Sequence, residues 1–315
     1  MEIKVLFFGL GSIGLRHAKL LLDNFDVEIA AYRTTKNENK LKINEFRDYE
    51  AAFDFKPDIA FITNPTSLHI KTALDCAKKS IDLFIEKPLS HTLSGVTKLS
   101  NVIKKNHLFS YVAFCLRFHP VIKYLKNNLN LKDVIYSRIN CSSYLPLWRP
   151  DQNYKDSYSA NSSMGGGVIN DMIHELDYCE YLFGRINDIK GTLGNTSTLE
   201  INSEDFAELT VTNKNNFMSQ ISLDYFSHQR ERIIKIYTKD FMILGDLNKY
   251  KIEYYQNYNL VKEINFNVND IYYDQLEYVF SYYEKRKLNN FSTVDNAINI
   301  LEKIQRLKQE NSDEL

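Results

Sequence analysis

The sequence has little cysteine, glycine, proline or tryptophan, and neither sign of charge is in excess. Its 315 residues include 4 Cys, 11 Gly, 6 Pro and 1 Trp, with 39 Lys and Arg against 40 Asp and Glu. The balanced charge gives no basic stripe for nucleic acid. A disordered chain is excluded because it would have few aromatic residues and a high net charge, whereas 13% of this chain is aromatic. The length favours two domains or one large one.

Long apolar runs are also missing. The longest one near the N-terminus, Val5–Leu10, is far short of the ~20 residues that span a bilayer, and it is too short for a secretory signal. The four cysteines, at 76, 115, 141 and 179, are 39, 26 and 38 residues apart, so no pair has metal or redox spacing. We expect four reduced, buried thiols in a cytoplasmic protein without a metal site, and neither a membrane nor a nucleic acid as partner.

The first third of the chain alternates short apolar strands with amphipathic helices. Strands are predicted at 3–8, 27–32, 59–63, 83–85 and 110–114, and helices at 15–22, 68–79 and 93–105. This alternation predicts a parallel sheet with crossover helices.

The pattern changes near residue 118. A helix at 121–128 and a strand at 134–143 precede a long loop, 144–164, and a helix at 168–183. Turn-linked strands then predict a mostly antiparallel sheet, closed by helices at 271–283 and 294–308. We therefore predict an α/β protein with domains 1–118 and 119–315. The later strands are expected at 207–212, 218–225, 233–237, 242–246, 251–255 and 260–265.

A glycine-rich turn follows the first strand. Residues 9–14, Gly-Leu-Gly-Ser-Ile-Gly, match G-x-G-x-x-G and open a helix, which is the context that gives the motif meaning. Gly9 permits the tight turn, Gly11 the approach of a diphosphate, and Gly14 close helix–strand packing. The helix N-terminus at Ser12 and Ile13 supplies N–H donors. These residues predict a dinucleotide site.

The tip of the second strand lacks the acidic residue that binds the ribose of NAD. Instead it reads Tyr32-Arg33-Thr34. A planar guanidinium suits a 2′-phosphate and stacks on adenine, and Thr34 adds a donor. We therefore expect NADP(H) to be favoured over NAD(H), with a solvated surface arginine as the alternative interpretation.

Glu86-Lys87-Pro88 ends a further strand, and Pro88 fixes the chain so that Lys87 lies at the carboxyl edge of the sheet, where ligands bind. With these motifs in order, the chain resembles the Gfo/Idh/MocA (glucose–fructose oxidoreductase-like) family, and within it a subgroup of polysaccharide biosynthesis. The resemblance rests on residues 9–17, 57–69, 86–88, 116–120 and 165–174.

The resemblance implies an N-terminal Rossmann domain with a doubly wound parallel sheet, and a C-terminal α/β domain with a large open, mostly antiparallel sheet. It implies NAD(P)-dependent oxidation or reduction of sugars or polyols, and a homodimer or homotetramer formed through the C-terminal sheet. Lys87 is expected to contact the nicotinamide ribose or the substrate. The cofactor-binding residues further include Glu86, Asn64, Pro65 and His69.

Asp171 and His174 fall on one stripe of a predicted helix, together with Asp177 or Tyr178. A histidine flanked by carboxylates suits proton transfer near neutral pH. We expect His174 to take the proton of the substrate hydroxyl and Asp171 to orient it. The commonest family pattern is Asp-x-x-x-His, whereas this chain has Asp-x-x-His, as the subgroup does. The alternative is a polar helix face at a domain surface.

The loop after 143 carries the only tryptophan, Trp148, beside Arg149 and ahead of Tyr158. A long loop in a compact domain is usually functional, and aromatic rings beside charged groups suit a sugar or a sugar carrying a phosphate or nucleotide. Arg117 is expected at an interdomain cleft as a further substrate residue. The alternative for the loop is a mobile surface segment or a subunit contact.

The sequence thus predicts an NAD(P)-dependent oxidoreductase that acts on CH–OH groups of a sugar derivative, used in surface-glycan synthesis. Two alternatives remain open. One is an inositol or polyol dehydrogenase, and the other is a regulator on the same fold that binds NADP(H) without turnover.

Overall fold

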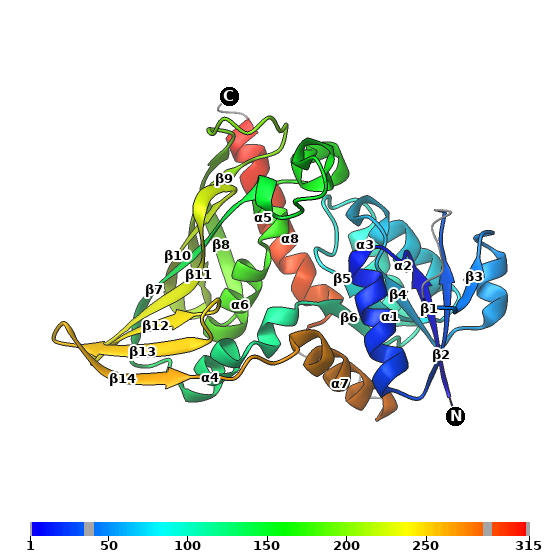
Figure 1. Ribbon diagram of the computed structural model, residues 1–315, viewed down its shortest axis with the longest axis horizontal. Coiled ribbons are helices and arrows are strands. Elements are labelled where there is room, and N and C mark those ends of the chain that lie inside the picture. The colour runs from blue at the N-terminus through cyan, green and yellow to red at the C-terminus, as the bar shows by residue number, and fades with distance from the viewer. Residues whose placement is uncertain (1, 35–40, 286–291, 313–315) are drawn as a thin grey trace. The chain divides into compact units, whose positions relative to one another are not determined.

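The computed structural model describes residues 2–34, 41–285 and 292–312 (Figure 1). The chain forms two compact units. Unit 1 comprises Met1–Phe114 and Tyr272–Leu301, and unit 2 comprises Cys115–Ile271 and Glu302–Leu315.

The sheet of unit 1 has six parallel strands in the order β3-β2-β1-β4-β5-β6. This order reverses between β1 and β4 and is the doubly wound order of dinucleotide-binding folds, so the predicted Rossmann sheet is confirmed. One strand, β3, was not predicted because its three residues carry no period-2 apolar pattern. The strands are β1 (Ile3–Phe8), β2 (Val27–Tyr32), β3 (Asn44–Phe46), β4 (Ile59–Ile62), β5 (Asp82–Glu86) and β6 (Ser110–Ala113).

Helices cover both faces of this sheet. On one face Phe61 and Phe84 pack with Leu21 of α1 (Ser12–Asn24) and with Leu276 and Phe280 of α7 (Ile271–Glu284). On the other face α2 (His69–Lys78) and α3 (Val96–Lys105) pack together, and α2 contacts β4 and β5.

The division into units differs from the predicted domains at the predicted boundary and in the placement of one later segment. Unit 1 ends its first segment at Phe114, and it also contains Tyr272–Leu301, which the prediction assigned to the second domain. The reason is that α7 buries its apolar side chains on the first sheet. A local hydrophobic pattern shows that a helix is amphipathic but not which sheet it covers.

Unit 2 contains an eight-stranded sheet in the order β14-β13-β12-β11-β7-β10-β9-β8. All its pairings are antiparallel except that of β7 with β10, which confirms the mostly antiparallel sheet. The strands are β7 (Val134–Tyr144), β8 (Ile186–Gly194), β9 (Phe206–Asn213), β10 (Met218–Asp224), β11 (Phe226–Thr238), β12 (Met242–Asp246), β13 (Lys251–Gln256) and β14 (Asn259–Asn265).

The helices α4 (Pro120–Asn128), α5 (Val168–Asp171) and α6 (His174–Phe183) also belong to unit 2. The last helix, α8 (Val294–Ser312), begins in unit 1 and ends in unit 2. The single helix predicted at 168–183 is in fact two, because Met172 takes a ψ of 28° and interrupts the helical ladder between Asp171 and His174. Loop 144–164 contains short 3₁₀ turns at Leu145–Leu147, Tyr154–Asp156, Tyr158–Ala160 and Ser162–Met164.

All four cysteines are buried thiols, as predicted. Burial raises the pKa of Cys141 and of Cys179 to about 12, so both are protonated at neutral pH. Within residues 2–34, 41–285 and 292–312, no helix has the length and apolar character needed to cross a membrane. Over the same residues, no three His, Cys, Asp or Glu side chains are grouped as a metal site would require.

Candidate functional site

The phosphate loop of unit 1 is shaped by close backbone packing. Gly9 has a φ of +100°, and a Cβ there would lie 2.9 Å from the Asn64 Cα. A Cβ on Gly14 would lie 2.5 Å from the Gly9 carbonyl oxygen, which also accepts a 2.7 Å hydrogen bond from the Thr63 hydroxyl. Both positions therefore need glycine for reasons of conformation and space.

Gly11 differs from the other two glycines, because a Cβ there would meet no atom within 4 Å. It caps α1 without a side-chain hydrogen bond, and the first turn of that helix carries no acidic residue. The backbone N–H groups of Ser12 and Ile13 thus begin a 13-residue helix beside open space. This arrangement fits the diphosphate of a dinucleotide.

Arg33 follows β2 and is buried, with 6% of its surface exposed, so it is not the solvated residue of the alternative interpretation. Its Nη1 donates to Glu45 Oε1 at 2.6 Å. Thr34, next in the chain, is exposed. The carboxyl end of β2 therefore holds a paired cation.

The loop after β4 is tied to the Glu-Lys-Pro turn by His69. The two ring nitrogens of His69 lie 2.9 Å from the carbonyl oxygens of Pro88 and Asn64. The Asn64 amide donates to Thr72 Oγ1, and Pro65 precedes the turn that leads into α2. Burial lowers the pKa of His69, and the hydrogen bonds to the two carbonyl oxygens act in the opposite direction. His69 acts here as a brace between two loops at the carboxyl edge of the sheet.

Glu86, at the end of β5, is buried and points at other protein groups. Its Oε1 lies 2.7 Å from His17 Nε2, and its Oε2 accepts a hydrogen bond from the Lys87 backbone N–H at 3.1 Å. Lys87 is partly buried and precedes a cis peptide bond to Pro88. Glu86 thus fixes the backbone from which Lys87 extends. His17 was not predicted as a site residue, although it lies in segment 9–17, on which the family resemblance partly rests.

In unit 2 the predicted residues Tyr158 and Asp171 are in contact, and Trp148 is linked to them through Tyr225. Asp171 Oδ2 accepts the Tyr225 hydroxyl at 2.6 Å, and Tyr158 hydrogen bonds to the same carboxylate. The Trp148 ring packs edge-on against Tyr225, with centroids 5.3 Å apart. Tyr225 was missed, because nothing in a β-strand pattern indicates that it meets a residue 54 positions away.

These two tyrosines are held as neutral donors. Burial, followed by the nearby Asp171 charge, raises the pKa of Tyr158 and of Tyr225 well above the ordinary value. The Trp148 indole is anchored by a 2.9 Å hydrogen bond to Ser143 Oγ and is 39% exposed. The Arg149 guanidinium lies 5.6 Å from the Tyr158 ring centroid. The loop therefore presents an aromatic ring and a cation next to a carboxylate.

His174 begins α6 and is buried, with its Nε2 4.0 Å from the Cys115 sulfur. It follows Asp171 after the break in the helix. The His174 imidazole is therefore enclosed by the protein, with a buried thiol on one side.

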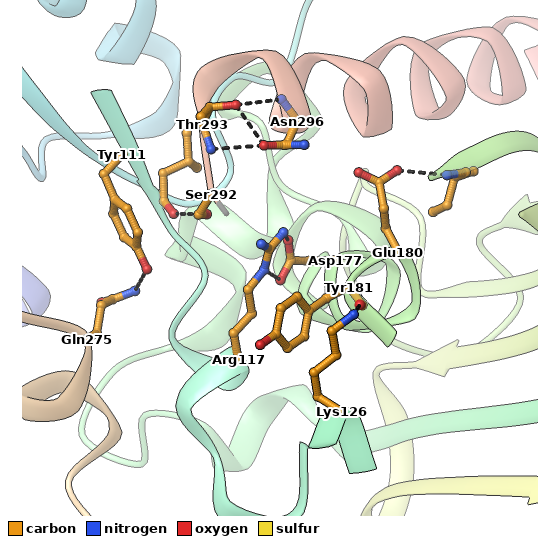
Figure 2. A network of polar contacts seen from close by, with 12 residues as sticks. Tyr111, Arg117, Lys126, Asp177, Glu180, Tyr181, Gln275, Ser292, Thr293 and Asn296 are labelled. Atoms are coloured by element: carbon orange, nitrogen blue, oxygen red, sulfur yellow. Dashed lines mark hydrogen bonds and ion pairs between the residues drawn. The ribbon is translucent and has the colours of Figure 1, made fainter. Parts of the chain in front are cut away.

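Arg117 is engaged in a closed ion pair inside unit 2. Its Nε and Nη2 donate to the two carboxylate oxygens of Asp177 at 2.9 and 2.5 Å, and both side chains are buried (Figure 2). The Tyr181 ring lies 5.0 Å from the guanidinium, and Lys126 donates to the Tyr181 carbonyl. Burial raises the pKa of Asp177, and Arg117 opposes that rise. This geometry supports a structural role where the sequence suggested a substrate contact.

Comparisons with known proteins show the family to which the chain belongs. The family model described as "Oxidoreductase family, NAD-binding Rossmann fold" matches residues 3–114, and the model of the GFO/IDH/MocA C-terminal domain matches residues 137–250. A scyllo-inositol 2-dehydrogenase (NAD(+)) of Bacillus subtilis is 26% identical over 200 residues, which are 60% of this chain and 57% of the relative. The chain spans about half the length of the curated relatives it matches.

Two solved structures share the fold over nearly the whole chain. The UDP-N-acetylglucosamine 3-dehydrogenase GnnA from Acidithiobacillus ferrooxidans has a TM-score of 0.80 at 18% identity and covers 98% of this chain and 97% of its own. GenD2 from gentamicin A biosynthesis, in complex with NAD, has a TM-score of 0.82 at 14% identity and covers 100% of this chain and 95% of its own.

Proposed function

Because the chain belongs to the Gfo/Idh/MocA family of oxidoreductases, we propose that it moves hydride between a nicotinamide dinucleotide and a CH–OH carbon of a sugar derivative. The observation that carries this proposal is the glycine loop. Gly9 and Gly14 are required by packing, whereas Gly11 faces open space at an uncapped helix N-terminus. Packing alone does not explain a glycine at position 11, whereas a diphosphate that binds close to the backbone there does.

When bound, the nicotinamide supplies a carbon that accepts or donates hydride. Lys87 extends from a turn that Glu86 fixes at the carboxyl end of β5, and its ammonium group would hold the substrate oxygen or the nicotinamide ribose. In the oxidation direction His174 takes the hydroxyl proton as the C–H bond breaks. Asp171, whose carboxylate accepts hydrogen bonds from Tyr158 and Tyr225, is proposed to orient the His174 imidazole and to accept a hydrogen bond from a further substrate hydroxyl.

The substrate class follows from the loop that carries Trp148. An exposed indole with Arg149 beside it suits the apolar face of a sugar ring and an anionic substituent such as a phosphate or nucleotide. A fold neighbour is named as acting on a nucleotide sugar, and surface-glycan synthesis is a setting in which such substrates occur. A second candidate is a cyclic polyol, because a curated relative is an inositol dehydrogenase.

We propose that NADP(H) is favoured over NAD(H), since Arg33 and Arg47 place two guanidinium groups near the end of β2. The test is calorimetric titration of the purified chain with NAD⁺ and with NADP⁺. Tighter binding of NADP⁺ supports the preference, and equal or weaker binding contradicts it.

The activity itself is tested with a panel of nucleotide sugars, sugar phosphates and inositols, each followed by absorbance in the nicotinamide band. Turnover that is lost in both Lys87→Ala and His174→Asn, while Lys126→Met keeps it, supports the assigned roles. Turnover of inositols alone favours the second candidate. Cofactor binding without turnover of any compound favours a regulator on this fold.

The sheet of unit 2 offers a surface for self-association. Around Arg138, Gln220 and Lys235 its β7, β10 and β11 strands form a hollow of polar side chains. We propose a homodimer or homotetramer joined through this sheet in the cytoplasm, where the buried thiols stay reduced. Light scattering of the purified chain tests it, because a monomer at micromolar concentration contradicts the proposal.

A further inference from the structure

A carboxylate is held between two guanidinium groups at the carboxyl ends of β2 and β3. Glu45 Oε1 accepts from Arg33 Nη1 at 2.6 Å, and Glu45 Oε2 accepts from Arg47 Nη2 at 2.9 Å. The Nη1 of Arg47 also donates to the Arg33 carbonyl at 3.1 Å. Each oxygen of Glu45 therefore has a charged donor.

The sheet register places this cluster at the edge where a dinucleotide fold selects its cofactor. Strand β3 runs parallel to β2, with Glu45 opposite Ala31 and Phe46 opposite Tyr32, so Arg33 follows directly at the strand end. The Arg33 backbone N–H donates to the Phe46 carbonyl at 3.2 Å. In this class of fold, the end of the second strand faces the ribose 2′ position.

The charges of the three side chains leave a net of one positive charge, and they are unequally exposed. Arg33 is 6% exposed and the Glu45 side chain 13%, whereas the Arg47 side chain is 46% exposed. Because Glu45 is shielded from water, its charge is weakly screened and acts on an anion bound to Arg33. Its hydrogen bond also uses one of the two N–H groups of Arg33 Nη1, which a 2′-phosphate could otherwise accept from.

We propose that Glu45, supplied by β3, sets the choice between NAD(H) and NADP(H) by partly neutralising the arginines and repelling a 2′-phosphate. The inference rests on the proposed function, because it requires that a nicotinamide dinucleotide binds. It goes beyond the preference inferred from Arg33. The affinity for a 2′-phosphate now depends on attraction by two arginines and on repulsion by Glu45. The end of β2 has no acidic residue of its own, and Glu45 of the neighbouring strand β3 supplies a carboxylate there.

The test compares dissociation constants of NAD⁺ and NADP⁺ by isothermal titration calorimetry on the full chain. In Glu45→Gln the side chain keeps an acceptor oxygen for Arg33 and loses its charge. We expect NADP⁺ to bind roughly tenfold more tightly than to the parent chain, because one repulsive charge next to a dianion is removed. The dissociation constant of NAD⁺ should change by less than about twofold, since NAD⁺ has no 2′ charge.

Glu28→Gln is the matched control. Glu28 lies in β2 and forms an exposed ion pair with Lys4 at 3.1 Å, so this variant loses the same charge from the same strand away from its carboxyl end. Both constants should stay at the parent values. A similar gain for NADP⁺ in Glu28→Gln would show a general effect of net charge and would overturn the assignment to Glu45.

Arg47→Ala gives the reciprocal arm and remains informative if Glu45→Gln does not fold. It brings the cluster to zero net charge and releases Glu45 Oε2 to accept a ribose hydroxyl, so NADP⁺ should bind roughly tenfold more weakly relative to NAD⁺. An NADP⁺ to NAD⁺ ratio within twofold of the parent in both variants overturns the inference alone. A weaker NADP⁺ affinity in Glu45→Gln overturns it too, since Glu45 would then only position Arg33. A parent chain that binds neither dinucleotide removes the proposed function itself.

Discussion

The two units build their functional residues by different means. In unit 1 the phosphate loop is set by backbone contacts, in which Gly9 and Gly14 touch other main-chain atoms directly. In unit 2 buried side-chain pairs take this part, with Asp171 and Tyr225 at the candidate site and Arg117 and Asp177 as a structural pair. Added atoms at Gly9 or Gly14 would disturb the backbone packing of the loop in unit 1. In unit 2, the loss of either partner would disturb a buried side-chain pair. The following substitutions test that difference.

The largest effect is expected from Arg117→Ala in unit 2. It leaves the Asp177 carboxylate buried without its bidentate partner, which should lower the free energy of unfolding by about 4 kcal/mol. Urea denaturation measures this, and Lys126→Met, beside the same tyrosine, should cost less than about 1 kcal/mol. A loss of catalysis in Arg117→Ala with unchanged stability would instead restore the substrate role predicted from the sequence.

Next comes a pH effect at His119. Burial lowers the pKa of His119 from 6.5 to about 4, and its Nδ1 accepts the Val121 N–H at the start of α4. Between these two values the unfolded chain binds a proton that the folded chain does not. Stability is therefore full above pH 6.5 and falls as the pH drops toward 4, by up to about 3 kcal/mol from this residue.

His119→Gln should remove that part of the acid sensitivity, because a glutamine still presents an acceptor to Val121. The measurement is the urea midpoint at several pH values between 7.5 and 4. His228→Gln, which changes a histidine packed against Tyr144 in the same unit, serves as the control. Equal pH dependence in His119→Gln and the parent chain would contradict the assignment.

The glycines of the phosphate loop should respond in opposite ways. Gly14→Ala forces a methyl group against the Gly9 carbonyl and should cost about 2 kcal/mol of stability. Gly11→Ala meets no neighbour, so its melting temperature should match the parent chain. Its dinucleotide affinity should nevertheless fall at least tenfold, since the methyl group takes the space left for the diphosphate. Thermal melts and cofactor titrations on both variants decide, and a destabilised Gly11→Ala would contradict the open space.

The smallest effect is the coupling between Tyr225 and Asp171. A hydrogen bond from a hydroxyl to a buried carboxylate should give an interaction free energy of about 1.5 kcal/mol in a double-mutant cycle of Tyr225→Phe and Asp171→Asn. The same cycle with Tyr181→Phe should give less than about 0.5 kcal/mol, because Tyr181 packs on Arg117. Equal coupling in both cycles would mean that the Tyr225 hydroxyl does not act on Asp171.

Features written in consecutive residues were predictable from the sequence. The strands at 3–8 and 27–32 and the glycine loop between them match the structure, because apolar runs and glycine spacing act locally. Glu45 escaped prediction, since its three-residue strand is recognised only by pairing with β2. Tyr225 and the Arg117–Asp177 pair escaped for a related reason. Tyr225 is 54 residues from Asp171, and Arg117 is 60 residues from Asp177. The charge or aromatic character of a residue does not predict which distant residue it contacts.

Helix α7 also gives the chain an order of events during synthesis. The six strands of the first sheet are complete at Ala113, yet the helix that covers part of one face starts only at Ile271, after the whole segment Cys115–Ile271 has been made. A nascent chain therefore carries an apolar sheet face without its final cover while unit 2 is still emerging. Synthesis of unit 1 therefore begins before that of unit 2 and is completed only after most of unit 2 has been made.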